Sequence, residues 1–397
     1  GTAGEAQNIT HSQKKIKEGE IKRFRDRFRL PISDDDLAQI PFIKPDEDSD
    51  EMQYLRERRK ELGGYLPMRK TDVPVLDVPA LDVFDMLLKN SGDRELSTTM
   101  VFVRMLSILT RDKNIGKRLV PIIPDEARTF GMEGLFRQLG IYSSSGQLYE
   151  PEDHDKIMWY REDTKGQILQ EGINEAGAIS EWIAAATAYT NHGISMIPFY
   201  IFYSMFGFQR VGDLIWAAGD MQARGFLLGG TAGRTTLNGE GLQHQDGHSL
   251  LASGGIPNCV SYDPTYAYEL AVIIQDGMRR MYQEKENIFY YITLMNENYK
   301  HPDMPKGAEQ GILRGMYLLK KGGRKKLRTQ LLGSGTILRE VEAAAELLEK
   351  DWNVSADVWS ATSFNELRRD MDDCERWNRL NPGKKSRCLL YTSDAAD

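Results

Sequence analysis

The feature that most constrains the fold is a series of short apolar segments interspersed with helical stretches between residues 76 and 306. The segments with strand character lie at residues 119–123, 157–160, 196–203, 225–228, 259–262 and 288–295. The helical stretches lie at residues 97–112, 131–140, 173–189, 206–224 and 265–282. Strands that are apolar throughout, separated by helices, indicate a parallel sheet covered on both faces. We therefore predict an α/β protein whose ligands bind beyond the carboxyl ends of its strands.

Three further segments flank this region. Residues 1–75 have the character of a connecting loop and a helical linker. Residues 307–387 contain a strand, a glycine turn, an amphipathic helix and one more strand, which begin another α/β domain too small to close its own core. Residues 388–397, CLLYTSDAAD, break with the character of the preceding chain and resemble translated sequencing-adapter sequence, so we do not expect them to belong to the fold. We expect a chain that is truncated at both ends.

Composition excludes several functional classes. The 397 residues correspond to roughly two to three domains, and 41% hydrophobic with 27% charged residues is typical of a globular protein with a large core. A net charge of −7 argues against nucleic-acid binding. The basic run KKIKEGEIKRFRDRFRL is followed by acidic runs, which favours a solvated helix face. The apolar run at residues 197–208 is shorter than the roughly 20 residues of a membrane helix. Three cysteines form no disulfide framework or metal pattern, which favours the cytoplasm.

One carboxyl group is placed on an apolar helical stripe. The helix predicted after Gly172 carries Glu175 on the same face as residues three, four, seven and eleven positions later, namely Ala178, Ile179, Trp182 and Ala186. A carboxyl group removed from water holds its proton more tightly and can act as an acid near neutral pH. The alternative is a partly exposed glutamate in the first helical turn, favoured there by the helix dipole. The pattern alone leaves both interpretations open.

A polar loop at residues 229–249 carries several candidate catalytic side chains. His244 and His248 have a spacing that holds a metal when helical, but glycines at 239, 241 and 247 argue against a helix. A glycine-rich loop with Glu240 and His244 is more naturally a catalytic loop, in which histidine moves protons near neutral pH. A loop whose imidazoles only satisfy local hydrogen bonds remains the structural alternative.

Two other strand ends carry side chains suited to ligand binding. Asp125 and Glu126 directly follow the strand at residues 119–123, at the end of a parallel strand that faces ligands. A structural pair with Arg128 is an equally common explanation. Tyr203 and Phe206 end the strand at residues 196–203, where an aromatic ring either stacks on a flat ligand or belongs to the core.

These pieces occur in collinear blocks that closely resemble a known family. The blocks are PDEARTFGMEGLFRQLGIYS, GQILQEGINEAGA, IPFYIFYSMFGFQRVGDLIWAAGDMQARGFLLGGTAGRTTLNGEGLQHQDGHS and IPNCVSYDPTYAYE. They resemble the thiamine-diphosphate-dependent decarboxylating subunit of the bacterial pyruvate dehydrogenase complex, of the homodimeric type. The resemblance extends from the first residues to about residue 387. It implies a transketolase-like pyrimidine-binding middle domain at residues 76–306, followed by the start of the C-terminal domain.

The resemblance also implies individual residue roles. Glu175 matches the glutamate that hydrogen-bonds N1′ of the cofactor's aminopyrimidine, Phe206 the aromatic residue that packs on that ring, and Ile173 an apolar cofactor contact. Tyr203, Glu240 and His244 match active-site residues that handle pyruvate. His11 matches a histidine on a mobile loop used to acetylate the lipoyl group, and this block is matched less tightly. Acidic residues at or near the active-centre cavity are matched by Asp125, Glu126 and Asp153.

One family motif is absent from the sequence. Thiamine-diphosphate enzymes resemble one another in a GDG motif and a later asparagine that hold Mg²⁺ and, through it, the diphosphate. No GDG occurs in this chain. The resemblance places that motif in a preceding domain, and it implies a homodimer that acts on pyruvate and on the lipoyl domain of dihydrolipoyl acetyltransferase. A transketolase, a 2-oxoglutarate dehydrogenase, a metallohydrolase and a non-enzymatic α/β interaction module remain as alternatives.

Overall fold

A computed structural model describes residues 15–64, 73–125, 127–152, 154, 160–232 and 241–389. The chain divides into two compact units, residues 1–69 and 70–397. The first contains α1 (Glu18–Phe28) and α2 (Asp50–Glu61). No residue of α1 is buried, and its Lys22 and Arg25 side chains both form ion pairs with Asp34. The basic run is therefore a solvated helix balanced by the acidic residues that follow it, as the charge pattern predicted.

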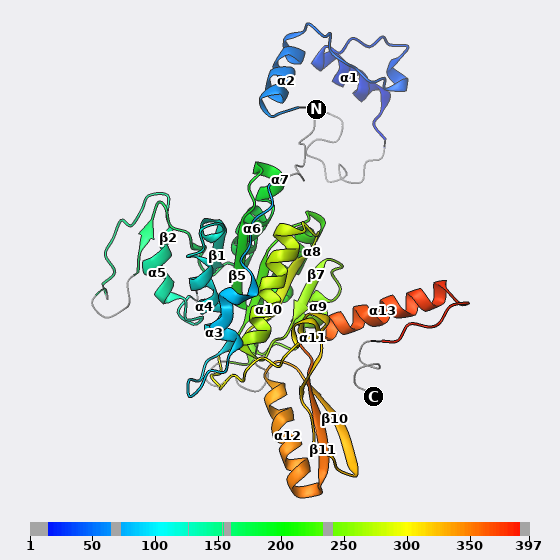
Figure 1. The fold of residues 1–397 in the computed structure, drawn as a ribbon. Coiled ribbons are helices and arrows are strands. Elements are labelled where there is room, and N and C mark those ends of the chain that lie inside the picture. Colours follow the sequence, from blue (N-terminus) through cyan, green and yellow to red (C-terminus); the bar gives the residue numbers. More distant parts are fainter. Residues whose placement is uncertain are drawn as a thin grey trace. The chain divides into compact units, whose positions relative to one another are not determined.

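The second unit is built on a six-stranded sheet (Figure 1). Across the sheet the strands follow the order β4 (Leu169–Gln170), β1 (Leu119–Ile123), β5 (Ile197–Tyr203), β6 (Phe226–Gly230), β8 (Phe289–Thr293) and β7 (Cys259–Tyr262). All neighbouring strands are parallel. The predicted α/β fold with a parallel sheet is confirmed.

Helices cover both faces of this sheet, because successive side chains of a strand point to opposite sides. In β1, Leu119 and Ile123 pack in a core with α4 (Thr98–Leu109) and α10 (Ala267–Met278). Val120 and Ile122 pack instead with α6 (Glu175–Ala186) and α8 (Phe208–Asp220). Burial on both sides explains why the strands read as continuous apolar runs and not as alternating patterns.

Several predicted elements differ in detail from the structure. The predicted helix at residues 173–189 is two helices, α6 and α7 (Ala188–His192), separated at Thr187. The helix predicted at residues 265–282 ends in a π-helical turn, Arg279–Gln283. The strand predicted at residues 157–160 lies outside the described residues except for Tyr160, which is not in a strand. The edge strand β4, which has only two residues, was not predicted.

Shorter elements complete the main body. The helices are α3 (Asp85–Leu88), α5 (Glu133–Leu139), α9 (Ser249–Ser253) and α11 (Glu309–Arg314). The strands β2 (Ile141–Tyr142) and β3 (Glu162–Asp163) form a separate parallel pair. None of the helices in the described ranges has the length and apolar character needed to span a bilayer.

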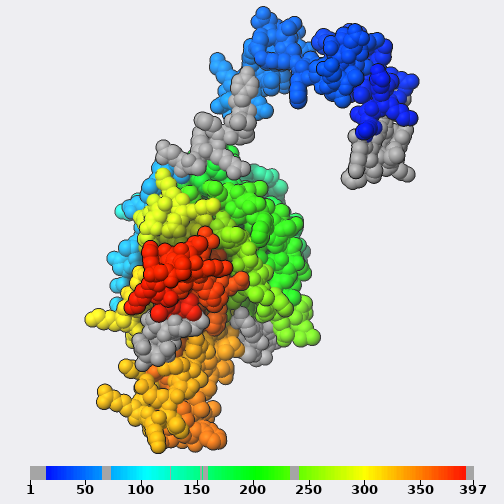
Figure 2. All heavy atoms as spheres, turned by 90° about the vertical axis from the view of Figure 1, so that its right-hand side faces the viewer, coloured from blue at the N-terminus to red at the C-terminus, as the bar shows by residue number. Residues whose placement is uncertain are grey.

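The residues after α11 form a smaller α/β layer. Its sheet has the order β10 (Leu327–Gly333), β11 (Val354–Ser360) and β9 (Tyr317–Lys320), with β10 and β11 parallel. The helices α12 (Ile337–Trp352) and α13 (Phe364–Leu380) follow β10 and β11. In Figure 2 the orange residues of this layer project from the larger body as a lobe.

A buried carboxylate joins this layer to the main body. Glu269, on α10, is fully buried. Its Oε1 accepts hydrogen bonds from Tyr317 Oη and Ser360 Oγ, both at 2.6 Å. Its Oε2 accepts from the backbone N–H groups of Thr265 at 2.6 Å and Tyr266 at 3.0 Å. Because a buried carboxylate is costly without partners, these four donors make Glu269 a specific anchor for the smaller layer.

Candidate active site

The candidate residues converge at the carboxyl ends of neighbouring parallel strands. Asp125 follows β1, Glu175 follows β4, and Tyr203 ends β5. A short 3₁₀ turn, Ser204–Phe206, then carries Phe206 over the same edge. Ligands of open α/β sheets bind at this edge, so the strand order alone brings together side chains that are far apart in the sequence.

Glu175 is the first residue of α6. The helix is capped by Asn174, whose side-chain oxygen accepts a hydrogen bond from the Gly177 N–H at 3.2 Å. Glu175 is 9% exposed, and all four apolar residues of the predicted stripe on α6 are buried with it. The prediction that this carboxyl group lies on the buried helical face is confirmed. The alternative was correct in placing Glu175 in the first helical turn and wrong in expecting it to be partly exposed.

A cation that the sequence analysis did not single out contacts this carboxylate. Arg210 Nη1 donates to Glu175 Oε1 at 2.7 Å. The Arg210 guanidinium carbon also lies 3.8 Å from the centre of the Phe206 ring. Arg210 is in the first turn of α8, where the helix dipole disfavours a cation, and it follows Phe206 by four residues. A basic residue in the first turn of a helix, four residues after an aromatic residue, was therefore the sequence signal that could have identified Arg210.

An aromatic cluster forms the neighbouring wall. The Tyr203 and His244 rings are stacked, with centroids 4.4 Å apart and an interplanar angle of 7°. The His244 ring also meets Phe206 edge-on at 5.4 Å, and Phe130 packs against Tyr203 at 5.4 Å. The structure therefore brings together Tyr203, Phe206 and His244, which lie on two different segments of the sequence.

The other predicted site residues are placed less centrally or lie outside the described ranges. Asp125 is exposed and accepts a hydrogen bond from Gln170 Nε2 at 3.1 Å, and Ile173 is 73% exposed. His248 is exposed and does not share the short turn Leu242–His244. Within the described ranges, no group of three or more His, Cys, Asp or Glu residues is arranged to hold a metal ion. The predicted residues outside the described ranges are His11, Glu126, Asp153 and Glu240.

A second carboxylate, that of Glu181, lies on the same helix α6, six residues after Glu175. Burial, and then the neighbouring carboxylate of Glu171, raise the pKa of Glu181 to about 7. One oxygen of Glu181, Oε2, is buried without a hydrogen-bond partner among the described residues. Glu171 approaches because Gly177 has no side chain: a Cβ there would lie 2.1 Å from Glu171 Oε1.

This carboxylate pair predicts a pH-dependent stability. An ordinary carboxyl pKa of 4.5 raised to about 7 means that the folded chain binds more protons than the unfolded chain between these pH values. Stability should therefore fall as pH rises through that window. We expect Glu181→Gln to raise the thermal midpoint at pH 8 by about 1–3 °C and to leave it nearly unchanged at pH 4.5, since Glu181 is half-exposed and partly screened. Glu171→Gln should reproduce part of the gain at pH 8. An identical pH profile for wild type and Glu181→Gln, followed by calorimetry, would contradict this assignment.

Comparison with known proteins gives a consistent result across most of the chain. Residues 76–302, more than half of the chain, match the family model described as the pyruvate dehydrogenase E1 component middle domain. Residues 315–389 match the transketolase-like C-terminal domain. The pyruvate dehydrogenase E1 component of Pseudomonas aeruginosa is 64% identical over 384 residues, which are 96% of this chain and 44% of that protein. The corresponding Escherichia coli K12 protein is 58% identical, over 96% of this chain and 43% of its own length.

Solved structures support the fold. The transketolase of Campylobacter jejuni has a TM-score of 0.54 at 18% identity, covering 89% of this chain and 49% of the transketolase. The transketolase of Leishmania mexicana has a TM-score of 0.52 at 17% identity, covering 72% of this chain and 39% of its own. At these identities the likeness concerns the fold alone. The chain spans less than half the length of the curated relatives it matches.

Proposed function

Because this chain belongs to the pyruvate dehydrogenase E1 family, we propose that it supplies the pyrimidine-binding half of an active site that oxidatively decarboxylates pyruvate. The cofactor would be thiamine diphosphate, which when bound supplies the nucleophilic carbon that attacks the 2-oxo group of pyruvate. The acceptor of the acetyl group would be the lipoyl domain of dihydrolipoyl acetyltransferase.

The contacts of Arg210 support the fit of a flat heterocycle at this place. Its planar, nitrogen-bearing guanidinium donates to Glu175 at 2.7 Å while lying 3.8 Å from the Phe206 ring centre. A single planar group can therefore contact the carboxylate and the aromatic face together. An aminopyrimidine offers the same combination of a π-face and a ring nitrogen that bonds to a carboxyl group. This is the observation that carries the proposal.

Each side chain would then have a distinct role. Glu175 would exchange a proton with the ring nitrogen N1′, and its burial would keep water from competing for that bond. Phe206 would pack on the ring, and Ile173 would add an apolar contact. Tyr203, stacked on His244, would hold the imidazole where it can bind and protonate pyruvate oxygens. Glu240 would also take part in handling pyruvate, and Asp125, Glu126 and Asp153 would lie at or near the active-centre cavity. His11 would serve in the acetylation of the lipoyl group.

The Mg²⁺ and diphosphate half of the site would be provided by residues outside this chain. The sequence contains no GDG motif, and the chain covers 44% of a relative such as the P. aeruginosa protein. We propose that residues 1–75 act as an inter-domain linker, 76–306 as the pyrimidine-binding domain and 307–387 as the beginning of the C-terminal domain, with 388–397 not native. The active site would be completed in a cytoplasmic homodimer.

A direct test compares the 397-residue chain with the complete protein. We expect the chain alone to bind thiamine diphosphate weakly and to release no CO₂ from pyruvate, because only one half of the site is present. The measurement is isothermal titration with thiamine diphosphate and Mg²⁺, followed by a ¹⁴CO₂ assay with [1-¹⁴C]pyruvate. Saturable, Mg²⁺-dependent binding together with turnover by the chain alone would contradict the half-site assignment.

Substrate choice separates the enzymatic alternatives. The complete protein should decarboxylate pyruvate and leave 2-oxoglutarate and sugar phosphates unchanged. Preference for 2-oxoglutarate would indicate a 2-oxoglutarate dehydrogenase, and ketol transfer between sugar phosphates a transketolase. Stoichiometric zinc in the purified protein would instead favour a hydrolase built on Glu240, His244 and His248. Activity that survives both Glu175→Gln and His244→Ala would favour a non-enzymatic interaction module.

A further inference from the structure

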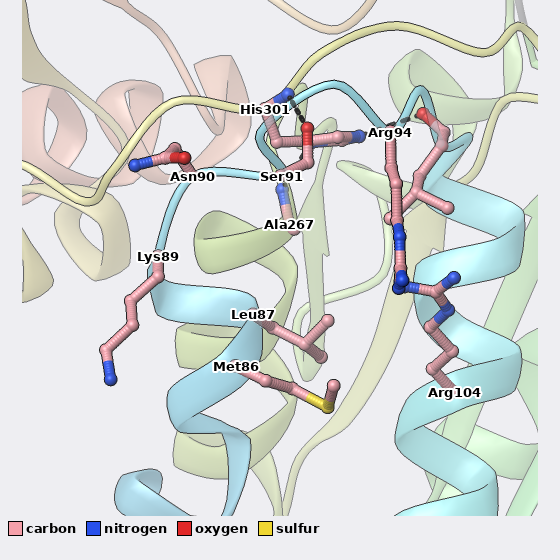
Figure 3. Close-up of a pocket in the computed structure, with 10 residues that line it drawn as sticks. Met86, Leu87, Lys89, Asn90, Ser91, Arg94, Arg104, Ala267 and His301 are labelled. Atoms are coloured by element: carbon pink, nitrogen blue, oxygen red, sulfur yellow. Dashed lines mark hydrogen bonds between the residues drawn. The ribbon is translucent and has the colours of Figure 1, made fainter.

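A cavity of about 180 Å³ lies on the α4 and α10 side of the second unit, and none of its lining residues belongs to the candidate active site. Its wall comes from the segment between α3 and α4, from α4 itself, from the start of α10 and from His301. Figure 3 shows the polar part of this wall, formed by Lys89, Asn90, Ser91, Arg94, Arg104 and His301.

The cavity has an unbalanced positive charge. The side chains of Arg94 and Arg104 extend toward one another (Figure 3), and no aspartate or glutamate is among the residues that line the cavity. Neither arginine forms an ion pair with another described residue, and Asp93, the acidic neighbour of Arg94, is paired with Lys300 at 3.1 Å. Two positive charges that lie close together repel one another, and a bound anion offsets this repulsion because both charges attract it.

The His301 side of the cavity is hydrogen-bonded and neutral. His301 is buried, and its Nδ1 accepts a hydrogen bond from the Ala267 N–H at 3.0 Å, while its Nε2 lies 2.9 Å from the Leu96 carbonyl oxygen. Since Nδ1 is an acceptor, the ring proton is on Nε2 and is donated to Leu96. Burial, and then the charge of Arg104, lower the pKa of His301, so the ring stays neutral at pH 7. His301 therefore fixes the wall and leaves ligand binding to the arginines.

The hydrogen bonds of the remaining polar residues show which donors in the cavity are available to a ligand. Asn90 is engaged, because its side-chain amide and its backbone N–H both donate to Asp303. Ser91 Oγ accepts a hydrogen bond from the backbone N–H of His301 at 2.9 Å, which leaves the hydroxyl proton of Ser91 available to donate. The two guanidinium forks and the Ser91 hydroxyl group are therefore the donors available to a ligand, while Met86 and Leu87 supply an apolar side. The Lys89 side chain extends away from the two arginines (Figure 3).

We propose that this cavity is a binding site for the phosphate group of a small metabolite, held between Arg94 and Arg104. Paired guanidinium forks match the tetrahedral oxygens of a phosphate dianion, which accepts several charge-assisted hydrogen bonds at once. The cavity volume is sufficient for a phosphate group with a short organic part against Met86 and Leu87. The site is independent of the proposed decarboxylation, because it shares no residue with the active site.

Isothermal titration of the 397-residue chain at low ionic strength tests this site, with inorganic phosphate and glycerol 3-phosphate as probes. We expect saturable binding, and we expect Arg94→Ala and Arg104→Ala each to weaken it at least about tenfold through the loss of charge-assisted bonds. The matched control is Arg111→Ala, which removes an exposed arginine just beyond α4 and should leave the affinity unchanged. Circular dichroism checks folding, and the exposed Arg94 provides a variant that should fold even if Arg104→Ala does not.

The outcomes separate the two sources of phosphate. Tighter binding of glycerol 3-phosphate identifies an organic phosphate as the ligand, and tighter binding of inorganic phosphate identifies the free anion. Arg94→Lys should retain only part of the affinity, since an ammonium group cannot form the bidentate contact. Absence of saturable binding of both probes, or equal affinities for the wild type and both arginine-to-alanine variants, would overturn the proposal.

Discussion

Replacing Glu175 by glutamine in the complete protein is expected to lower kcat for pyruvate decarboxylation by about 10²–10⁴-fold, the range typical for loss of a positioned acid–base group. Glutamine keeps an oxygen that can accept the hydrogen bond from Arg210, so the packing of α6 should survive. It cannot exchange a proton with the ring nitrogen. The measurement is the steady-state rate of CO₂ release with saturating thiamine diphosphate and Mg²⁺, together with the cofactor affinity from fluorescence titration.

The control for Glu175→Gln is Glu309→Gln, because Glu309 is also the first residue of a helix, α11, and has no place in the site. Its rate should match that of the wild type. Phe206→Leu should act differently from Glu175→Gln: it removes the aromatic face and should weaken cofactor binding more than it lowers kcat at saturation. A Glu175→Gln enzyme with a wild-type rate at saturating cofactor would refute the assigned role.

Replacing Glu269 by alanine is expected to lower the free energy of unfolding by about 3–5 kcal/mol, because a buried donor left without its acceptor costs about 1–3 kcal/mol. Four donors would lose their acceptor, namely two hydroxyl groups and two backbone N–H groups. Because Tyr317 and Ser360 lie in the smaller layer, the loss should detach that layer from α10 before the main sheet unfolds. Urea denaturation followed by circular dichroism and by tryptophan fluorescence measures both effects, since Trp359 lies in β11.

Glu340→Ala provides the matched control for Glu269→Ala. Glu340 is an exposed glutamate on α12 without a role at the junction, so its removal should change stability by about 0.5 kcal/mol or less. Ser360→Ala, which removes one of the four donors, should cost about 1 kcal/mol. If Glu269→Ala and Glu340→Ala unfolded at the same urea concentration, the anchoring role of Glu269 would be wrong.

Local sequence periodicity was sufficient to predict most of the main sheet and to put Glu175 on the apolar stripe of α6, but it left the burial of this carboxyl group open. Strands buried on both faces must be apolar at every position, so β1 and β7 were predicted with the bounds that the structure has. A helix buries residues three and four apart, so the stripe from Glu175 to Ala186 identified the buried face of α6. The two-residue strand β4 was missed because two residues carry no period, and its pairing with β1 depends on tertiary contacts.

The sequence by itself determined the parallel α/β architecture, the family and the place of Glu175 on an apolar helical stripe, because each of these depends on local pattern or on long collinear blocks. Only the tertiary structure decided which distant side chains meet. It set Arg210 between Glu175 and Phe206, stacked His244 on Tyr203, tied Glu269 to Ser360 and turned Arg94 toward Arg104. The physical reason is that charge pairing and ring stacking act over a few ångströms in space, where strand order, and not distance along the chain, selects the neighbours.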